Sequence, residues 1–412
     1  MRVSAYVVVP LMSIVVSADV CAADEISDIV TKGKIDLGLR YRYEYVDQDN
    51  ALKHANANTI RTRFGLQSGS WYGLTAALEV DNVSRIGEEQ YNDTRNKKVL
   101  YSTVGDPDGT EINQLYLRYQ QPFGGLTVGR QKIELDNQRF VGSVAWRQNE
   151  QSFDGGTLRV TPTDTLTFTY SYIDNINTPF GPDGDHGYPT NPANIKGHSQ
   201  FFHANWRPSK ELSASLYSYL LGLDNLAVAA NALPGTQSSR TTGLRLSGLL
   251  ADFGYAAEYA RQSSYADNPN NLDGKYYLAE LSYQKNGYQG KAGYEVLSGD
   301  NGSANRAFQT PLATKHIFQG WADVFLITPS TGIRDSYAGG TIPVVGGSLQ
   351  MWYHKFDSDA GSIDYGTEWD VSYTHPIPYI KNLSVMAKYA SYNANDYSVD
   401  TDKFWLQAQY QF

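Results

Sequence analysis

The sequence predicts an all-β fold, a transmembrane antiparallel up-and-down β-barrel of about eighteen strands. Three observations predict it. The chain opens like a secreted protein, its segments of about ten residues alternate apolar with polar side chains, and the connections between them alternate long and short. The composition agrees, because 31 tyrosines and 37 glycines against 4 methionines suit many short strands with tight turns and aromatic residues at a lipid interface.

The start of the chain, residues 1–23, is typical of a cleaved signal peptide. Arg2 precedes an apolar run from Val7 to Val16, and small residues follow near the expected cleavage point. The single Cys21 lies in this segment, so the mature chain needs no disulfide. No later stretch of eighteen or more apolar residues occurs, which argues against helical membrane spans. Residues 24–412 contain no linker and no shift in composition, and are expected to form one barrel domain.

Residues 34–45, KIDLGLRYRYEY, show the two faces of the expected strands. Odd positions from Ile35 to Tyr45 are apolar or aromatic, and even positions are mostly charged. The pattern returns in NTIRTRFGL, in INQLYLRYQ and in KFWLQAQYQF at 403–412. One face therefore fits hydrocarbon and the other water. A large soluble β-sandwich would alternate in the same way.

The connections separate the barrel from the sandwich. Short turns such as QPFGG, RPSK and KNG alternate with long connections. The long connections are expected at 47–57, 82–111, 135–150, 175–197, 223–238, 263–274 and 299–332. A membrane barrel predicts this asymmetry, since short turns face the periplasm and long loops face outside. An even number of strands also lets the two terminal strands pair and close the barrel.

The last strand ends on Phe412, with Phe404, Leu406 and Tyr410 on the same face. Such a terminal strand looks like the assembly signal of bacterial outer-membrane barrels. We therefore expect the chain to reside in the bacterial outer membrane, with outer-membrane lipid and the barrel-assembly machinery as partners.

The most distinctive segment is LTVGRQKIELDNQRFVGSVAWRQNEQSFDG, Leu126 to Gly155, which resembles the alginate-export family of outer-membrane channels. LGLRYRYE, NTIRTRFGL, FQTPLATKHIFQGWADVFL and DTDKFWLQAQYQF are similar to blocks of that family and follow the same order. The resemblance implies a monomeric barrel of about eighteen strands. It also implies passage of an anionic uronate polysaccharide, or its fragments, through an arginine-lined pore.

The arginines allow a physical check of this implication, because guanidinium matches a uronate carboxylate with two parallel hydrogen bonds and stays charged. Strand parity points six of them into the lumen: Arg40, Arg42, Arg61, Arg63, Arg118 and Arg245. Three more, Arg130, Arg139 and Arg147, belong to the distinctive segment, which by analogy with porins is expected to fold inward and narrow the pore. A bulge near Gly129 is expected to turn Arg130 inward. The alternative for each arginine is an ion pair with an acidic side chain across the strands that only holds the wall.

Net charge and motifs restrict the other functions. A formal charge of −9 makes nucleic acid an unfavourable partner. The alternative function within transport is a general or catabolic uptake porin for small anions or oligosaccharides, since a passive channel moves solute down either gradient. An outer-membrane hydrolase is the remaining alternative, but His198 and Ser199 are strand neighbours that point apart, and we expect no enzyme.

No cofactor is expected. In GDPDGTE, the oxygen ligands Asp106, Asp108 and Glu111 are weak candidates for Ca²⁺ in an external loop, but their spacing departs from the twelve-residue calcium loop and favours a plain turn.

Overall fold

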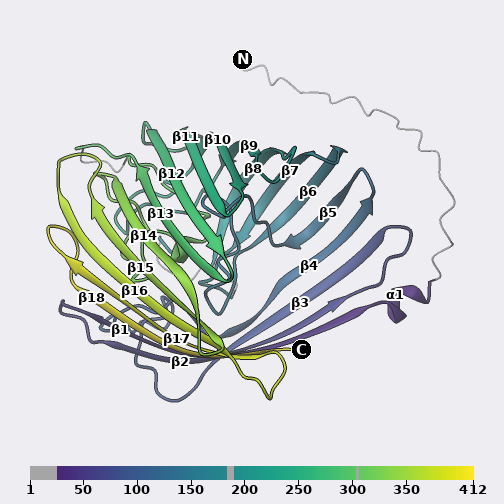
Figure 1. Ribbon diagram of the computed structural model, residues 1–412, viewed down its shortest axis with the longest axis horizontal. Coiled ribbons are helices and arrows are strands. Elements are labelled where there is room, and N and C mark those ends of the chain that lie inside the picture. The colour runs from purple at the N-terminus through teal and green to yellow at the C-terminus, as the bar shows by residue number, and fades with distance from the viewer. Residues whose placement is uncertain (1–25, 183–189, 303–305) are drawn as a thin grey trace.

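The computed structural model describes residues 26–182, 190–302 and 306–412, and the expected signal peptide lies outside them. Eighteen strands form one antiparallel sheet in which each strand pairs with the next and β18 pairs with β1 (Figure 1). This closure confirms the predicted barrel and its strand number. Among the described residues, no helix is long and apolar enough to cross a membrane.

The elements follow one another without crossovers. The strands are β1 (Lys34–Gln48), β2 (Ala55–Gln67), β3 (Leu74–Arg85), β4 (Gly109–Gln121), β5 (Gly124–Gln131), β6 (Ser152–Thr163), β7 (Leu166–Asn177), β8 (Asn194–Trp206), β9 (Ser213–Leu221), β10 (Ser239–Leu250), β11 (Phe253–Ser264), β12 (Asp273–Lys285), β13 (Tyr288–Leu297), β14 (Ile333–Val344), β15 (Gly347–Asp357), β16 (Asp364–Pro376), β17 (Leu383–Ala394) and β18 (Thr401–Gln411). A short helix, α1 (Asp28–Thr31), precedes β1, and a 3₁₀ turn, η1 (Lys315–Ile317), lies between β13 and β14.

The closing seam joins the first and last strands, drawn purple and yellow in Figure 1. The amide of Phe412 donates to the carbonyl of Leu37 at 2.7 Å, and the register runs from Gly38 opposite Gln411 to Gln48 opposite Thr401. Across this seam Arg40 Nε donates to Gln409 Oε1 at 3.1 Å. The ladder therefore continues around the whole ring.

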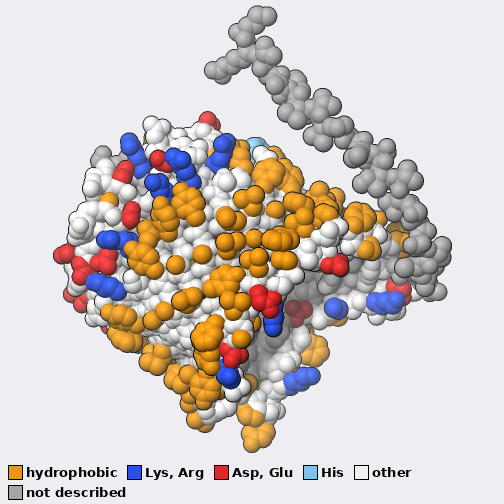
Figure 2. All heavy atoms as spheres, turned by 45° about the horizontal axis from the view of Figure 1, so that its top comes forward, with side chains coloured by type: hydrophobic (Ala, Val, Ile, Leu, Met, Phe, Trp, Pro, Cys, Tyr) orange, Lys and Arg blue, Asp and Glu red, His pale blue; other side chains and the backbone are white. Residues whose placement is uncertain are grey.

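The predicted alternation of faces is present. On β1, Ile35, Leu37 and Leu39 are exposed on the outside, whereas Arg40 and Arg42 are buried on the lumen side. Figure 2 shows the outward apolar side chains as a band across the outer surface. In a membrane this band would contact hydrocarbon.

The connections also follow the predicted asymmetry. The five longest, 86–108, 132–151, 178–193, 222–238 and 298–332, all follow odd-numbered strands and so lie at one end of the barrel. The opposite end has tight turns. In the turn between β12 and β13, Asn286 (φ 52°) and Gly287 (φ 85°) both adopt the left-handed conformation that a type I′ hairpin turn requires.

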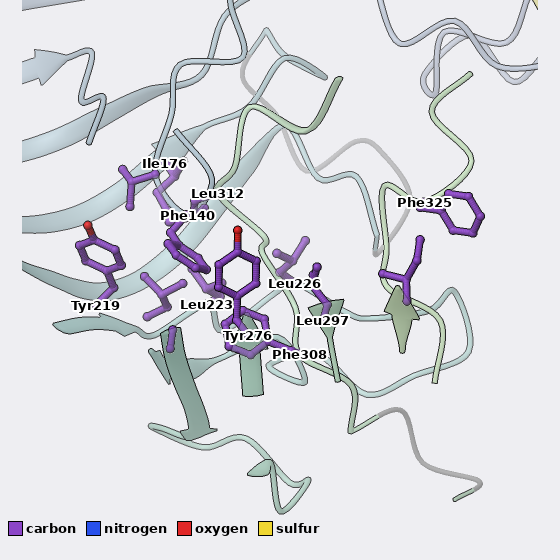
Figure 3. Close-up of a cluster of buried hydrophobic side chains, with 14 of the residues drawn as sticks. Phe140, Ile176, Tyr219, Leu223, Leu226, Tyr276, Leu297, Phe308, Leu312 and Phe325 are labelled. Carbon is purple, nitrogen blue, oxygen red and sulfur yellow. The ribbon is translucent and has the colours of Figure 1, made fainter. Parts of the chain in front are cut away.

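Two of the long connections fold into the barrel. We name them loop L5 (residues 132–151) and loop L13 (residues 298–302 and 306–332). They meet where the amide of Gly142 donates to the carbonyl of Leu312 at 2.9 Å. Phe140 of L5 packs on Tyr276 of β12 and on Phe308 of L13, with ring centroids 5.2 and 5.9 Å apart. Figure 3 shows this apolar cluster, which fills part of the barrel interior.

Candidate channel constriction

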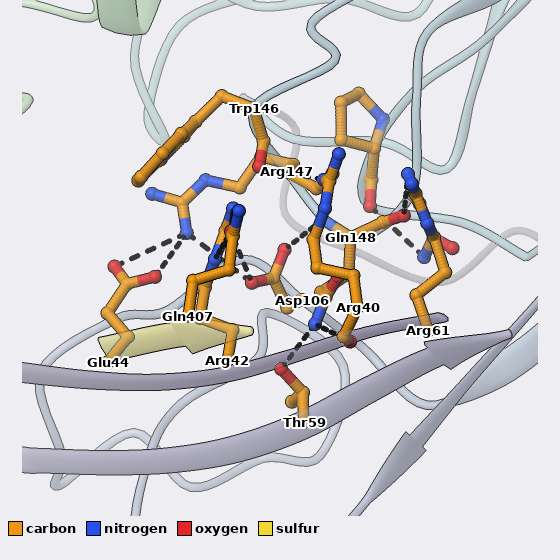
Figure 4. Close-up of polar contacts among 12 residues, drawn as sticks. Arg40, Arg42, Glu44, Thr59, Arg61, Asp106, Trp146, Arg147, Gln148 and Gln407 are labelled. Atoms are coloured by element: carbon orange, nitrogen blue, oxygen red, sulfur yellow. Dashed lines mark hydrogen bonds and ion pairs between the residues drawn. The ribbon is translucent and has the colours of Figure 1, made fainter. Parts of the chain in front are cut away.

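Loop L5 covers the first arginines of the barrel wall (Figure 4). Arg40 Nη1 donates to the carbonyls of Ala145 and Arg147 at 3.1 and 3.2 Å. Arg42 donates through Nε and Nη2 to Gln407 Oε1, and its guanidinium lies 4.1 Å from the ring centroid of Trp146. Both arginines point to the lumen side as predicted. They are buried beneath the loop, however, instead of lining open space.

Arg61 and Arg63 of β2 are buried in the same way. Arg61 Nη1 donates to Glu150 Oε1 at 3.2 Å, and Arg63 forms a two-pronged pair with Asp81 at 2.7 and 2.5 Å. Burial alone would raise the pKa of the Glu150 carboxyl, but Arg63, Lys132 and Arg61 outweigh it and lower this pKa to about 2. Glu150 is therefore ionised at neutral pH and anchors L5 to the cationic wall.

The two arginines within L5 hold the loop in place. Arg139 donates to Glu295 of β13 through Nε (2.7 Å) and Nη2 (3.3 Å) and is fully buried. Arg147 Nη1 donates to Glu44 of β1 at 3.0 Å, while its Nη2 donates to Asp323 of L13 at 3.2 Å. The inward folding of the segment agrees with the prediction, and both side chains tie it to the wall and to L13.

The prediction for Arg130 is wrong. Arg130 lies in β5, where it stands opposite Leu115 and shares a face with Val128, both of which are exposed on the outside. Gly129 has φ 123°, yet the register between β4 and β5 runs through it without a shift, so the strand keeps its alternation. Arg130 therefore faces outward and pairs with Asp154 at 2.7 Å.

Arg118 and Arg245 lie on lumen-facing positions. Arg118 Nε donates to Thr127 Oγ1 at 3.1 Å, and its guanidinium lies 4.9 Å from the ring centroid of Tyr116. Arg245 Nη1 donates to Glu258 Oε2 at 2.6 Å across β10 and β11. Of the nine arginines proposed from the sequence, Arg147 and Arg245 border the two interior cavities described next.

The weak calcium candidates do not converge. Asp106 is buried and lies 3.8 Å from both Arg42 and Arg147, and Asp108 lies 3.5 Å from Arg85. Within the described ranges, no group of three or more His, Cys, Asp or Glu side chains could hold a metal ion. Asp106 instead serves as a counterion to the arginines.

Among the described residues, two cavities lie in the interior around the loops. The outer one, of about 930 Å³, is bordered by both loops and by the connections 178–193 and 222–238; its charged side chains are Arg147, Lys315 and Asp323. The inner one, of about 380 Å³, lies against strands β10, β12 to β15 and β17. Its charged and aromatic side chains are Arg245, Lys291, Lys388, Glu280, Glu295, Asp335, His354, Trp146, Trp321, Tyr337, Trp352 and Phe318. His316 borders both cavities and so lies between them, which makes it the candidate constriction.

The constriction is built around His316. Its ring stacks on Trp146 with centroids 4.3 Å apart and planes 6° apart. Nδ1 donates to Asp323 Oδ1 at 2.8 Å, and Nε2 accepts from Lys388 Nζ at 2.7 Å. Burial and the nearby Lys388 lower the pKa of His316 to about 3, although Asp323 opposes this shift. The His316 ring is therefore neutral at neutral pH. Lys388 Nζ also lies 3.6 Å from the ring centroid of Trp321, so it contacts both His316 and an aromatic face.

Sequence reasoning did not select four side chains that border these cavities: Lys291, Lys315, His316 and Lys388. Lys388 has the lumen parity of its strand and could have been chosen by the rule that selected the arginines. Lys315 and His316 lie in the block FQTPLATKHIFQGWADVFL, which carries part of the family resemblance. No local signal shows that this block enters the barrel.

The comparisons with known proteins agree with this architecture. A model of the alginate export family matches residues 33–314, more than half of the 412 residues. The chain belongs to the alginate export family. This membership confirms the resemblance seen in the sequence, and the family and fold are those of porin-like channels of the outer membrane rather than of enzymes. No curated protein matches this alginate export family member.

Solved structures share the fold at low sequence identity. Pseudomonas aeruginosa OccK3 (OpdO) is 18% identical with a TM-score of 0.69, over 94% of this chain and 97% of that chain. Acinetobacter baumannii OccAB4 is 14% identical with a TM-score of 0.73, over 92% and 98%. Pseudomonas aeruginosa OpdK, solved with vanillate, is 14% identical with a TM-score of 0.69, over 93% and 99%. At these identities the likeness shows the fold alone.

Proposed function

We propose that this alginate export family member is a passive channel of the bacterial outer membrane for sugar acids, from single uronates to short oligouronates. The observation that carries the proposal is the pair of cavities that meet at His316, with cationic side chains on both sides of it. A solute that crosses the barrel by this route meets Arg147 and Lys315 first, then Lys388 and Lys291.

The lining of the inner cavity suits a sugar acid in particular. Ammonium groups of Lys291 and Lys388 attract the carboxylate. Glu280 and Asp335 accept hydrogen bonds from ring hydroxyls, whereas the faces of Trp352 offer apolar surface to the carbon skeleton. Its volume of about 380 Å³ falls in the range of small-molecule sites, which is about 300 to 1,000 Å³. A simple inorganic anion would need neither the acidic nor the aromatic side chains.

The inward loops favour a short solute over a long polymer. L5 and L13 carry a buried apolar cluster and the ion pairs of Arg139 and Arg147, so clearing the lumen would break several buried contacts at once. Family membership favours a polyuronate as the parent compound. The geometry supports passage of its fragments.

Planar bilayers test the proposal. We would measure the reversal potential in a salt gradient and the current block by glucuronate, a trimeric uronate and glucose. Wild type should prefer anions and be blocked by both uronates, with Lys291→Gln/Lys388→Gln weakening the block about tenfold because a charged hydrogen bond is lost. Lys210→Gln/Lys285→Gln, which removes two exposed charges at the end with the short turns, should leave it unchanged.

Equal block by glucose, or an unchanged block in the lumen variant, would overturn the proposal. Intact recovery of the uronate after passage into liposomes separates transport from hydrolysis. Release of shorter uronates by the purified protein would favour the hydrolase instead.

A further inference from the structure

The outer surface carries a row of cations at the end of the barrel where the long loops lie. Arg240 of β10, Arg261 of β11 and Lys275 of β12 are all exposed and stand on adjacent strands. Arg261 is directly opposite Lys275, and Arg240 is opposite Ser263, which places it diagonal to Arg261. They share their strand faces with the exposed Leu244, Tyr259 and Tyr277 and therefore point out of the barrel.

An aromatic pair lies directly below this row. Tyr259 and Tyr277 are opposite each other, with ring centroids 5.3 Å apart, and Leu244 is opposite Tyr259 on the next strand. Aromatic residues of membrane barrels mark the boundary between hydrocarbon and headgroups. Arg261 and Lys275 lie one step further toward the loops and Arg240 lies two steps further, so the three cations would lie at headgroup depth. Figure 2 shows Lys and Arg side chains at the upper left, beside hydrophobic side chains and with some Asp and Glu among them.

The charge of the row is only partly balanced. Like charges directly opposite each other, as Arg261 and Lys275 are, destabilise a sheet. Asp273 pairs with Arg261 at 2.8 Å, and among the described residues neither Arg240 nor Lys275 has an acidic partner within 4.0 Å. Three cations against one carboxylate leave a surplus of positive charge where the lipid headgroups would lie. An anionic headgroup would compensate it.

We propose that Arg240, Arg261 and Lys275 bind the phosphate groups of the outer-leaflet glycolipid, the lipid A part of lipopolysaccharide, with acyl chains lying over Tyr259, Tyr277 and Leu244. Guanidinium groups match phosphate oxygens with paired hydrogen bonds, and three cations spread over three strands match a headgroup with more than one phosphate better than a phospholipid with one. This inference depends on the outer-membrane location in the proposed function, but not on the solute that the channel passes.

The test is a binding measurement that does not involve conductance. Purified protein in phosphatidylcholine nanodiscs would be titrated with diphosphorylated lipid A, dephosphorylated lipid A and phosphatidylglycerol. Wild type should bind diphosphorylated lipid A most tightly, with an affinity that falls as salt is added. Arg240→Gln/Arg261→Gln/Lys275→Gln should weaken this binding about tenfold or more, whereas Lys34→Gln/Lys210→Gln/Lys285→Gln, an equal loss of charge at the opposite end, should not.

Heat-modifiable migration on gels would first show that each variant is a folded barrel. Should the triple variant fail this check, the three single variants take its place, each with a weakening of about threefold. Equal affinity of wild type and the variants of the row would overturn the proposal, and so would equal affinity for phosphatidylglycerol or for dephosphorylated lipid A. If the protein passed no uronate but bound diphosphorylated lipid A through this row, the proposed function would be wrong and the lipid-binding proposal would stand.

Discussion

Replacing Arg139 by alanine should release L5 from the barrel wall. Arg139 joins Glu295 through two hydrogen bonds and Thr310 through a third, and it is almost completely buried. Removing one partner of a buried ion pair typically costs about 3–5 kcal/mol. Glu295 would keep the hydroxyl of Tyr276 (2.7 Å) and the amide of Gln319 (3.1 Å), which favours the lower end, about 3 kcal/mol. At 1.4 kcal/mol per factor of ten, the packed arrangement of the loop would lose about two orders of magnitude in population relative to an open one.

Single-channel recording measures this loss. Arg139→Ala should show a larger mean conductance and shorter closed periods than wild type. In Arg139→Ala/Glu295→Ala both quantities should lie closer to the wild-type values, because no unpaired buried charge remains. Arg118→Ala is the matched control, since it removes a lumen arginine that contacts Thr127 and Tyr116 but neither loop. If Arg139→Ala matched wild type and Arg118→Ala in conductance and closed time, the ion pair would not hold the loop, and the reasoning would be refuted.

Three further predictions follow from the geometry. Burial lowers the pKa of His316 from 6.5 to about 3, so the stabilisation of the packed loops by this ring is complete above pH 6.5 and is lost as the pH falls toward 3. Channel conductance should therefore rise on acidification, and His316→Gln should make that rise smaller. Phe412→Gln should reduce the folded barrel on heat-modifiable gels, and an undiminished amount would contradict an assembly role for this residue. Gly287→Ala should destabilise the barrel by about 1 kcal/mol because φ is 85° there, whereas Gly290→Ala, with nothing within 4 Å of the added methyl, should have little effect in the same urea unfolding experiment.

The fold could be predicted from the sequence because its determinants are local. Alternation with a period of two fixes which residues of β1 face lipid, and the lengths of the connections fix which end of the barrel they join. Both are visible within about twenty residues of chain. Analogy with porins added the expectation that L5 folds inward.

The constriction could not be predicted in the same way. Parity shows that Arg40 and Arg61 face the interior, but it does not show that Ala145 and Glu150 of L5 cover them. The pair of Arg139 with Glu295 joins residues 156 apart, and no pattern in the sequence relates two such positions. The prediction for Arg130 failed for a different reason. It assumed a bulge at Gly129, but a glycine with positive φ can occur inside a strand whose register is continuous.

The seam between β1 and β18 pairs the two strands that are furthest apart in the chain. Every other pair of neighbouring strands is joined by a direct connection, whereas the bond from Arg40 to Gln409 spans 369 residues. Until β18 is available, β1 has a row of unpaired backbone groups that hydrocarbon cannot satisfy. A partly synthesised chain therefore has no stable place in the bilayer. Before closure, the unpaired edges of β1 and β18 leave the chain prone to aggregation.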